Sequence, residues 1–94
     1  MAAVYILYSK MLDKYYIGSC LDMEKRLEDH RNRKFEKSFA ARADDWVLYY
    51  SMCDLLYKQA RLIEVHIKRM KSRKYIENLK SYPEIAEKLK QLYI

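Results

Sequence analysis

A chain of 94 residues, 51% hydrophobic and 34% charged, is long enough for one domain with a modest core and too apolar for an intrinsically disordered segment. Its one glycine excludes phosphate-binding loops and dinucleotide fingerprints, and there is no GxSxG or HExxH motif. Ten tyrosines stand out, because each joins an apolar ring to a hydroxyl that needs a polar partner. Chemistry must therefore come from tyrosine, arginine, histidine and acidic side chains.

The net charge of +6 is concentrated in residues 58–80, where basic residues far outnumber acidic ones and account for the whole excess. Such a cluster favours a polyanionic partner, either nucleic acid or an anionic membrane. The alternative is a solvated helix face, which is what most charge runs turn out to be. The side chains predicted to contact nucleic acid are Lys58, Arg61, Lys68, Arg69, Lys71, Arg73 and Lys74.

The cysteines and the apolar segments indicate the compartment. Cys20 and Cys53 each have an apolar neighbour and form no CxxC pair, so we expect two free, buried thiols. A zinc site is disfavoured, since its four ligands would be scattered along the chain (Cys20, His30, Cys53 and His66). No apolar segment is long enough to cross a membrane, and the first residues lack the features of a secretory signal. We therefore expect a soluble cytoplasmic protein.

The first elements predicted along the chain are two strands. Residues 3–8 (AVYILY) and 14–18 (KYYIG) are short runs rich in β-formers, joined by a link of hairpin length. Both are apolar on both faces, which predicts a hairpin inside the protein. Asp22 is a candidate N-cap for a helix that ends near Arg33, and a loop follows to residue 45.

The second half of the chain is predicted to be mainly helical. Residues 46–50 (WVLYY) are a third strand candidate, and residues 54–70 have apolar side chains at the spacing of one buried helical stripe (Leu56, Ala60, Ile63, Ile67 and Met70). A helix over residues 72–80 precedes a break at Tyr82 and Pro83. Ser81 and Glu84 have capping-box spacing for a last helix that runs to Tyr93.

This order of elements predicts an α+β fold: a small three-stranded antiparallel or mixed sheet, made of a β-hairpin and a third strand, flanked by helices. Period-2 alternation allows Tyr5 and Tyr16 to lie on the same side of neighbouring strands. Gly18 ends the second strand, where the missing side chain lets another group approach closely. The competing interpretation, which is more common for strand tyrosines, is that both are core residues.

Three polar residues lie close to predicted apolar faces. Arg26 and His30 are spaced i, i+4 beside inward-facing residues, and an arginine and a histidine there suit phosphate binding and proton transfer. A snorkelling arginine with a structural histidine fits equally well. Glu64 lies at the edge of the stripe on residues 54–70, where one carboxylate can hold Mg²⁺ together with water and substrate phosphate. The alternative is that Glu64 forms an ion pair with Lys68 on the helix surface.

Together these residues resemble the GIY-YIG nuclease family. Ala3-Val4-Tyr5, followed eleven residues later by Tyr16-Ile17-Gly18, looks like the paired GIY and YIG motifs. The segment DMEKRLEDH, residues 22–30, is similar to the next family segment, in which a helical arginine is essential. Glu64 and the residues after it resemble the glutamate-bearing helix of small stand-alone, UvrC-like members. The resemblance covers the chain from residue 3 to about residue 79, and its one departure is Ala3 in place of the first glycine.

The resemblance implies a role for each matching residue. Tyr5 would orient or deprotonate the attacking water, and Tyr16 would hold the substrate phosphate or share that task. Arg26 would stabilise charge on the phosphate, with His30 assisting. Glu64 would hold a single Mg²⁺ or Mn²⁺ ion. Residues 1–94 would then form a single GIY-YIG nuclease-like domain.

Three functions remain open from the sequence. The first is a metal-dependent endonuclease that cuts DNA, including branched, nicked or single-stranded forms, as in DNA repair. The second is a binding module that keeps the fold but cuts weakly or only with a partner, and the third and least favoured is a ribonuclease. Family members with homing or repair roles carry extra DNA-binding domains, which this chain lacks. We therefore expect targeting by the basic stretch, by shape, or through a protein partner or homodimer.

Overall fold

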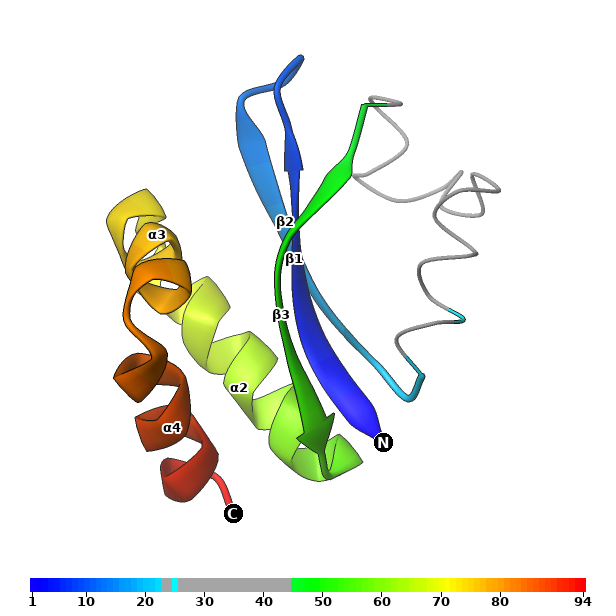
Figure 1. Cartoon of the computed structure of the whole chain (residues 1–94), viewed down its shortest axis with the longest axis vertical. Coiled ribbons are helices and arrows are strands. Elements are labelled where there is room, and N and C mark those ends of the chain that lie inside the picture. Colours follow the sequence, from blue (N-terminus) through cyan, green and yellow to red (C-terminus); the bar gives the residue numbers. More distant parts are fainter. Residues whose placement is uncertain (23–24, 26–44) are drawn as a thin grey trace.

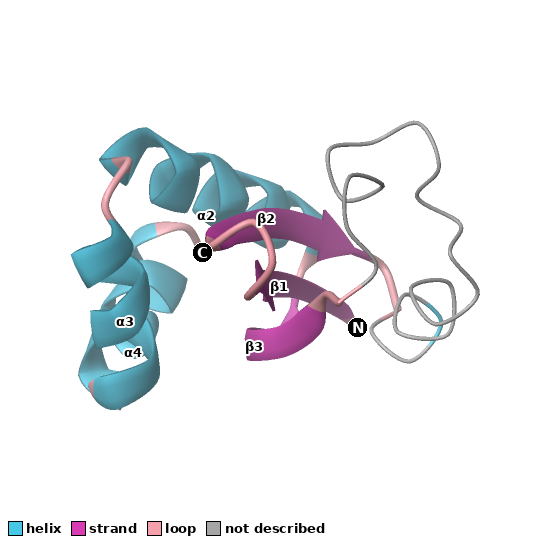
Figure 2. Ribbon diagram, turned by 90° about the horizontal axis from the view of Figure 1, so that it is seen from above, coloured by secondary structure: helices cyan, strands magenta, loops and turns pink. Residues whose placement is uncertain are grey.

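The structure is a computed structural model, and it describes residues 1–22, 25 and 45–94. It has the predicted α+β architecture, with all three described helices on one side of a three-stranded sheet (Figure 1 and Figure 2). The elements are β1 (Ala2–Ser9), β2 (Lys14–Cys20), β3 (Val47–Leu55), α2 (Tyr57–Met70), α3 (Arg73–Ser81) and α4 (Pro83–Leu92).

The first strand is the centre of the sheet. The strand order is β2-β1-β3, and β1 pairs antiparallel with both neighbours. Because β1 is covered on both faces, its run of apolar residues needs no alternation with polar ones. The predicted buried hairpin is therefore correct for β1 and wrong for β2. As an edge strand, β2 has an exposed Lys14 and only partly buried residues from Tyr15 to Ile17.

The register of β1 with β2 separates the hairpin into two faces. Tyr5 lies opposite Gly18, and Leu7 lies opposite Tyr16. These residues belong to one cluster, which we call the tyrosine face; its buried members are Ala3, Tyr5, Leu7, Cys20 and Trp46. The alternate residues of β1 point the other way and form the helix face; its members from the sheet and α2 include Val4, Ile6, Met52, Ala60, Ile63 and Ile67.

Helix α2 packs against the helix face through the predicted stripe, although it starts later than predicted. Ala60, Ile63 and Ile67 are buried, whereas Leu56 and Met70 at the two ends are exposed. The predicted start at residue 54 is wrong, because β3 continues to Leu55 instead of ending at residue 50. These residues continue the strand because Met52 pairs with Val4 of β1 and Leu55 pairs with Ala2, which buries both side chains.

Helices α3 and α4 complete the helical layer. Ser72 caps α3 by accepting a hydrogen bond from the Tyr75 backbone N–H (3.1 Å). The predicted capping box of Ser81 and Glu84 is wrong: Ser81 is the last residue of α3, and α4 begins with Pro83 and has no side-chain cap. Both helices fill the same core as α2, through the buried residues Ile76, Leu79, Ala86 and Leu89.

The structure also describes the start of the predicted first helix and both cysteines. Asp22 accepts a hydrogen bond from the Lys25 backbone N–H (3.3 Å), as expected of an N-cap, but the rest of that predicted helix lies outside the described residues. The Cys20 thiol is buried as predicted, whereas the Cys53 side chain is exposed, contrary to the prediction. The pleat of β3 turns Met52 into the core and its neighbour Cys53 outward. Among the described helices, none is long and apolar enough to span a membrane.

The packing of α2 gives the first testable prediction. We expect Ile63→Ala to lower the free energy of unfolding by about 2–5 kcal/mol, because it opens a cavity at a fully buried position. The matched control is Leu62→Ala, next to it on the same helix and 40% exposed, which should cost less than about 1 kcal/mol. Urea denaturation of the three proteins measures both values. Equal losses would show that α2 is not packed by this stripe.

Candidate active site

The tyrosine face brings three of the predicted site residues together. The Tyr5 ring lies directly over Gly18: a Cβ added to Gly18 would lie 2.6 Å from Tyr5 Cζ and 3.1 Å from Tyr5 Cε2. The Tyr16 ring stacks beside that of Tyr5 with 6.4 Å between centroids, and Trp46 meets Tyr16 edge-on at 6.2 Å. The glycine is therefore required by a close contact, since its backbone is of an ordinary type.

The two tyrosines differ in their exposure. Tyr5 is only 2% exposed and belongs to the core, whereas Tyr16 on the edge strand is half-buried. The sequence left open whether these residues are core or functional, and the structure places Tyr5 in the core. Of the pair, Tyr16 is the side chain with more of its surface open to solvent.

Glu64 projects from α2 toward the far end of β2. Its Oε1 accepts a hydrogen bond from the Ser19 hydroxyl, and its Oε2 pairs with Lys68 Nζ at 2.6 Å. The surface pair with Lys68 that sequence considered as an alternative is therefore present. The Ser19 contact was not predicted, because no local pattern links residues 45 positions apart.

The carboxyl of Glu64 is held in its charged form. Burial alone would raise its pKa, but the hydrogen bonds from Lys68 and Ser19 and the nearby charges of Lys68 and Arg61 outweigh burial and lower it. With 16% of the side chain exposed, Glu64 is an ionised carboxylate at the edge of the core.

The tyrosines and Glu64 lie on opposite faces of the sheet and approach the same edge. Gly18 is on the tyrosine face, and its neighbour Ser19, which contacts Glu64, is on the helix face. Among the described residues, no strand pairs with the outer edge of β2. A molecule at that edge would thus meet the Tyr16 side from one direction and Glu64 from the other.

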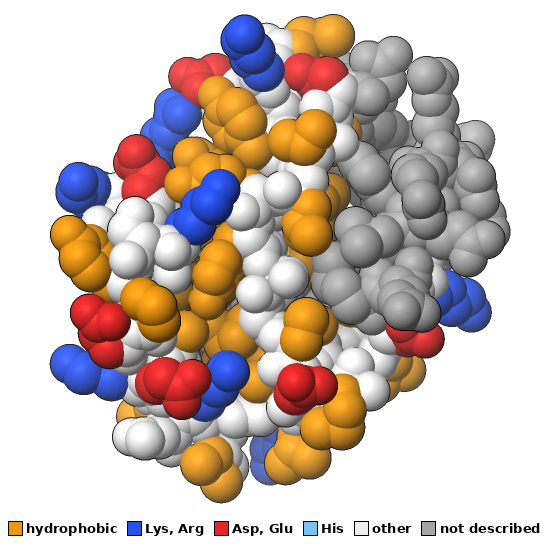
Figure 3. Space-filling view, in the orientation of Figure 1, with side chains coloured by type: hydrophobic (Ala, Val, Ile, Leu, Met, Phe, Trp, Pro, Cys, Tyr) orange, Lys and Arg blue, Asp and Glu red, His pale blue; other side chains and the backbone are white. Residues whose placement is uncertain are grey.

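Helical geometry divides the predicted basic residues into two groups. Arg61, Lys68 and Lys71 recur at the spacing of one helix flank together with Glu64. Lys58 and Arg69 lie on a different flank. All five are exposed. On the side shown in Figure 3, basic and acidic side chains are interleaved with apolar ones, so the charge excess in sequence does not form a single basic patch there.

Arg73 and Lys74 begin α3, directly after the turn that ends α2. Lys74 is exposed, and Arg73 forms a bidentate pair with Asp13, with Nη2 to Oδ1 at 2.7 Å and Nη1 to Oδ2 at 3.0 Å. This pair holds the pKa of the Asp13 carboxyl far below its usual range. It joins the hairpin turn to α3 and was not predicted. Arg26 and His30 lie outside the described residues.

These features define a small α+β domain with paired hairpin tyrosines, a glycine under one ring and a carboxylate on the following helix. A family model described as the GIY-YIG catalytic domain matches residues 1–77, and the chain belongs to that family. The family consists of DNA endonucleases, and its members generally use a divalent metal. Comparison with curated proteins and with solved structures finds no match.

The described residues can be tested for their fit to such a metal. They contain no cluster of three or more His, Cys, Asp or Glu side chains. Mg²⁺ commonly takes one or two protein carboxylates and completes its shell with water and phosphate oxygens. Glu64 is ionised and partly exposed, and each of its oxygens keeps a lone pair besides the bond to Ser19 or Lys68. This single carboxylate therefore fits a hydrated divalent ion.

The contact between Tyr5 and Gly18 yields a second prediction. We expect Gly18→Ala to displace the Tyr5 ring, because the new methyl group would overlap it inside a packed cluster. The loss of stability should be about 1–3 kcal/mol, measured by urea denaturation, with a changed near-UV circular dichroism spectrum. Restoration of stability in the double variant Gly18→Ala, Tyr5→Leu would support the overlap. A single variant as stable as wild type would contradict it.

The partners of Glu64 yield a third prediction. In the variant Ser19→Ala, Lys68→Met, we expect the pKa of Glu64 to rise, because burial then acts without the opposing hydrogen bonds. Since the wild-type pKa is lowered on folding, its stabilising contribution is present above the pKa of the unfolded chain and is lost as pH falls through the folded pKa. Carbon-13 NMR titration of the Glu64 carboxyl measures the pKa. An unchanged value would show that these contacts are not formed in solution.

Proposed function

We propose that this protein is a divalent-metal-dependent DNA endonuclease whose active site lies at the outer edge of β2. The observation that carries the proposal is that two groups approach the same edge of the sheet, one at Gly18 and the other at Ser19. The stacked tyrosines lie on one face of this edge, and the ionised Glu64 is held at the other. Hydrolysis of a phosphodiester needs a group that binds a cation and a group that handles a proton, and these side chains supply both.

The chain's own residues have distinct roles in this proposal. Tyr16, the more accessible tyrosine, contacts the substrate phosphate, and Tyr5 stacks beside the Tyr16 ring. The role of Tyr5 toward the attacking water rests on the family motif. Arg26 stabilises negative charge on the phosphate, and His30 assists as a proton carrier. The roles of Arg26 and His30 rest on the family motif.

Glu64 is the residue that would hold Mg²⁺ or Mn²⁺. When bound, the ion polarises the phosphate and lowers the pKa of a coordinated water. Ser19 orients the Glu64 carboxylate through its hydrogen bond. Arg61 and Lys68, on the same helix flank, keep the carboxylate charged and attract the polyanionic substrate.

We infer a UvrC-like member of the family in which residues 1–94 act as one nuclease domain in the cytoplasm. Its DNA would be recognised through phosphate contacts and shape, as in repair of branched, nicked or single-stranded DNA. A protein partner or homodimer would supply any further targeting.

One observation favours the alternative of a DNA-binding module without strong cleavage. Both carboxylate oxygens of Glu64 already have partners in the chain, Ser19 and Lys68. A metal must therefore compete with the Lys68 ammonium for the same carboxylate. In this alternative Glu64 is a structural residue that joins α2 to β2, and the basic residues bind phosphates without catalysis.

Cleavage of supercoiled plasmid and of branched DNA with Mg²⁺ or Mn²⁺ tests the proposal. We expect metal-dependent cutting that Glu64→Gln and Arg26→Ala each reduce by about a hundredfold or more, since each removes charge stabilisation at the reacting phosphate. The matched control is Glu87→Gln, an exposed carboxylate on α4, which should cut like wild type.

The outcomes separate the two functions. If wild type and the control variant cut DNA while both active-site variants do not, the endonuclease is supported. Wild-type protein that binds DNA in a salt-sensitive way and cuts nothing supports the binding module. Activity that survives both active-site substitutions would mean that the reaction occurs elsewhere.

A further inference from the structure

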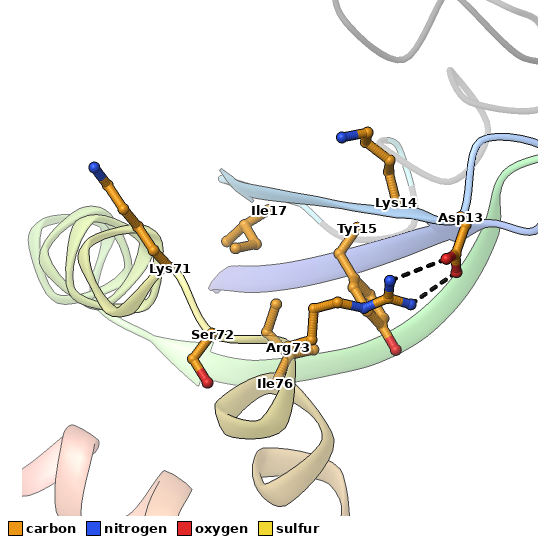
Figure 4. A pocket seen from close by; sticks show the side chains of 8 residues that line it. All are labelled: Asp13, Lys14, Tyr15, Ile17, Lys71, Ser72, Arg73 and Ile76. Carbon is orange, nitrogen blue, oxygen red and sulfur yellow. Dashed lines mark hydrogen bonds and ion pairs between the residues drawn. The ribbon is translucent and has the colours of Figure 1, made fainter.

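A second feature lies along the same edge of the sheet, between β2 and the junction of α2 with α3. It is a pocket of about 390 Å³, within the size range of small-ligand sites. Figure 4 shows that its walls come from the hairpin and from the turn between the helices. The lining residues are Asp13, Lys14, Tyr15, Ile17, Lys71, Ser72, Arg73 and Ile76.

The pocket combines an apolar wall with cations at its rim. Tyr15, Ile17 and Ile76 are buried or half-buried and supply the apolar surface. Lys14 and Lys71 are exposed, one on the strand and one on the helix junction (Figure 4). Within the part of the chain that the structure describes, neither lysine forms an ion pair. A ligand with a flat apolar part and a negative charge would match both surfaces.

Arg73 supplies a planar surface that is fixed in place. Its guanidinium is held by both oxygens of Asp13 and lies over the Tyr15 ring, 5.5 Å from the centroid (Figure 4). Asp13 is fixed in turn by the Tyr8 hydroxyl, at 2.7 Å. Guanidinium planes and tyrosine rings are the surfaces on which proteins stack unpaired bases. Because 57% of the Arg73 side chain is exposed, this plane is open to a ligand.

Backbone strain also concentrates at this pocket. Among the described residues, three other than glycine have positive φ, and two of them, Asp13 (52°) and Lys71 (47°), line it. Lys71 ends α2 at a position where glycine is the usual residue. The structure keeps a lysine there at a conformational cost, and strain of this kind concentrates at functional sites.

We propose that this pocket binds one unpaired nucleotide of single-stranded DNA. Its base stacks on the Arg73 and Tyr15 surface against the apolar wall, and its phosphate lies at Lys14 and Lys71. The inference rests on the proposed function and deepens it, because it assigns the enzyme to substrates with an unpaired strand next to the cutting site.

The position of the pocket is consistent with one strand that occupies both sites. Lys71 follows Glu64 by seven residues, a rise of about 10 Å along α2. A duplex strand rises about 3.4 Å per nucleotide and an extended single strand rises more, so this distance corresponds to roughly three nucleotides at most. Lys68 lies between them on the same flank. A strand cut near Glu64 would thus place a nearby nucleotide in the pocket.

The test measures binding in EDTA, so that cleavage does not contribute. Fluorescence anisotropy compares a labelled 12-nucleotide oligodeoxythymidylate with a 12-base-pair duplex. Arg73→Lys keeps the net charge but removes the planar surface, and Lys71→Gly removes one cation while fitting the backbone better. We expect each to weaken single-strand binding by about tenfold, with far smaller changes for the duplex. Lys88→Ala, an exposed lysine on α4, controls for the loss of one charge.

Each outcome bears on the proposal directly. Single-strand binding by Arg73→Lys equal to wild type, or equal weakening of single strand and duplex, overturns it. A melting temperature of Lys71→Gly at or above the wild-type value shows that weaker binding by this variant is not caused by unfolding. If the pocket variants lose single-strand binding while wild type cuts no DNA, the nuclease fails and the nucleotide site stands. If wild type cuts DNA and the variants bind normally, only the nucleotide site fails.

Discussion

The antiparallel register of the central strand is the constraint on which the rest of the structure depends. Placing Tyr5 opposite Gly18 settles which β1 residues face the tyrosines and which face the helices. A shift of one residue would exchange the two sets and bury the wrong side of the hairpin. The same register sets Ser19 on the helix face, where it meets Glu64. The pairing of β1 with β2 therefore determines both the fold and the position of the candidate site.

Electrostatics at Glu64 follow from its place at the boundary between core and solvent. Full burial would favour the neutral acid, whereas full exposure would leave the carboxylate without a fixed orientation. Ser19 and Lys68 hold a charged carboxylate in one position without enclosing it. The hydrogen bond that stabilises the ionised form thus also aims it at the edge of β2.

Sequence patterns predicted those features that depend on local periodicity. The strands, the buried stripe at Ala60, Ile63 and Ile67, and the break before Pro83 are all visible in the spacing of apolar and helix-breaking residues. The alternation allowed Tyr5 and Tyr16 to share one side of the hairpin, and Gly18 to admit a close neighbour. It did not identify Tyr5 as that neighbour, because strand register depends on the whole sheet. Contacts between residues far apart in the sequence leave no local pattern from which they could be predicted. Ser19 with Glu64, and Asp13 with Arg73, join segments that only the folded chain brings together.

Helix α4 limits where this chain and a relative from the family can be joined in a chimeric protein. The family match ends at residue 77, in the middle of α3, yet Ala86 and Leu89 from α4 fill the same core as the helix that carries Glu64. Gln59 of α2 also donates a hydrogen bond to the Lys90 backbone carbonyl, at 2.9 Å. A crossover between this chain and a relative would cut through that core if it were placed at the limit of the match. A chimera that keeps this core intact would therefore take α2, α3 and α4 from the same parent.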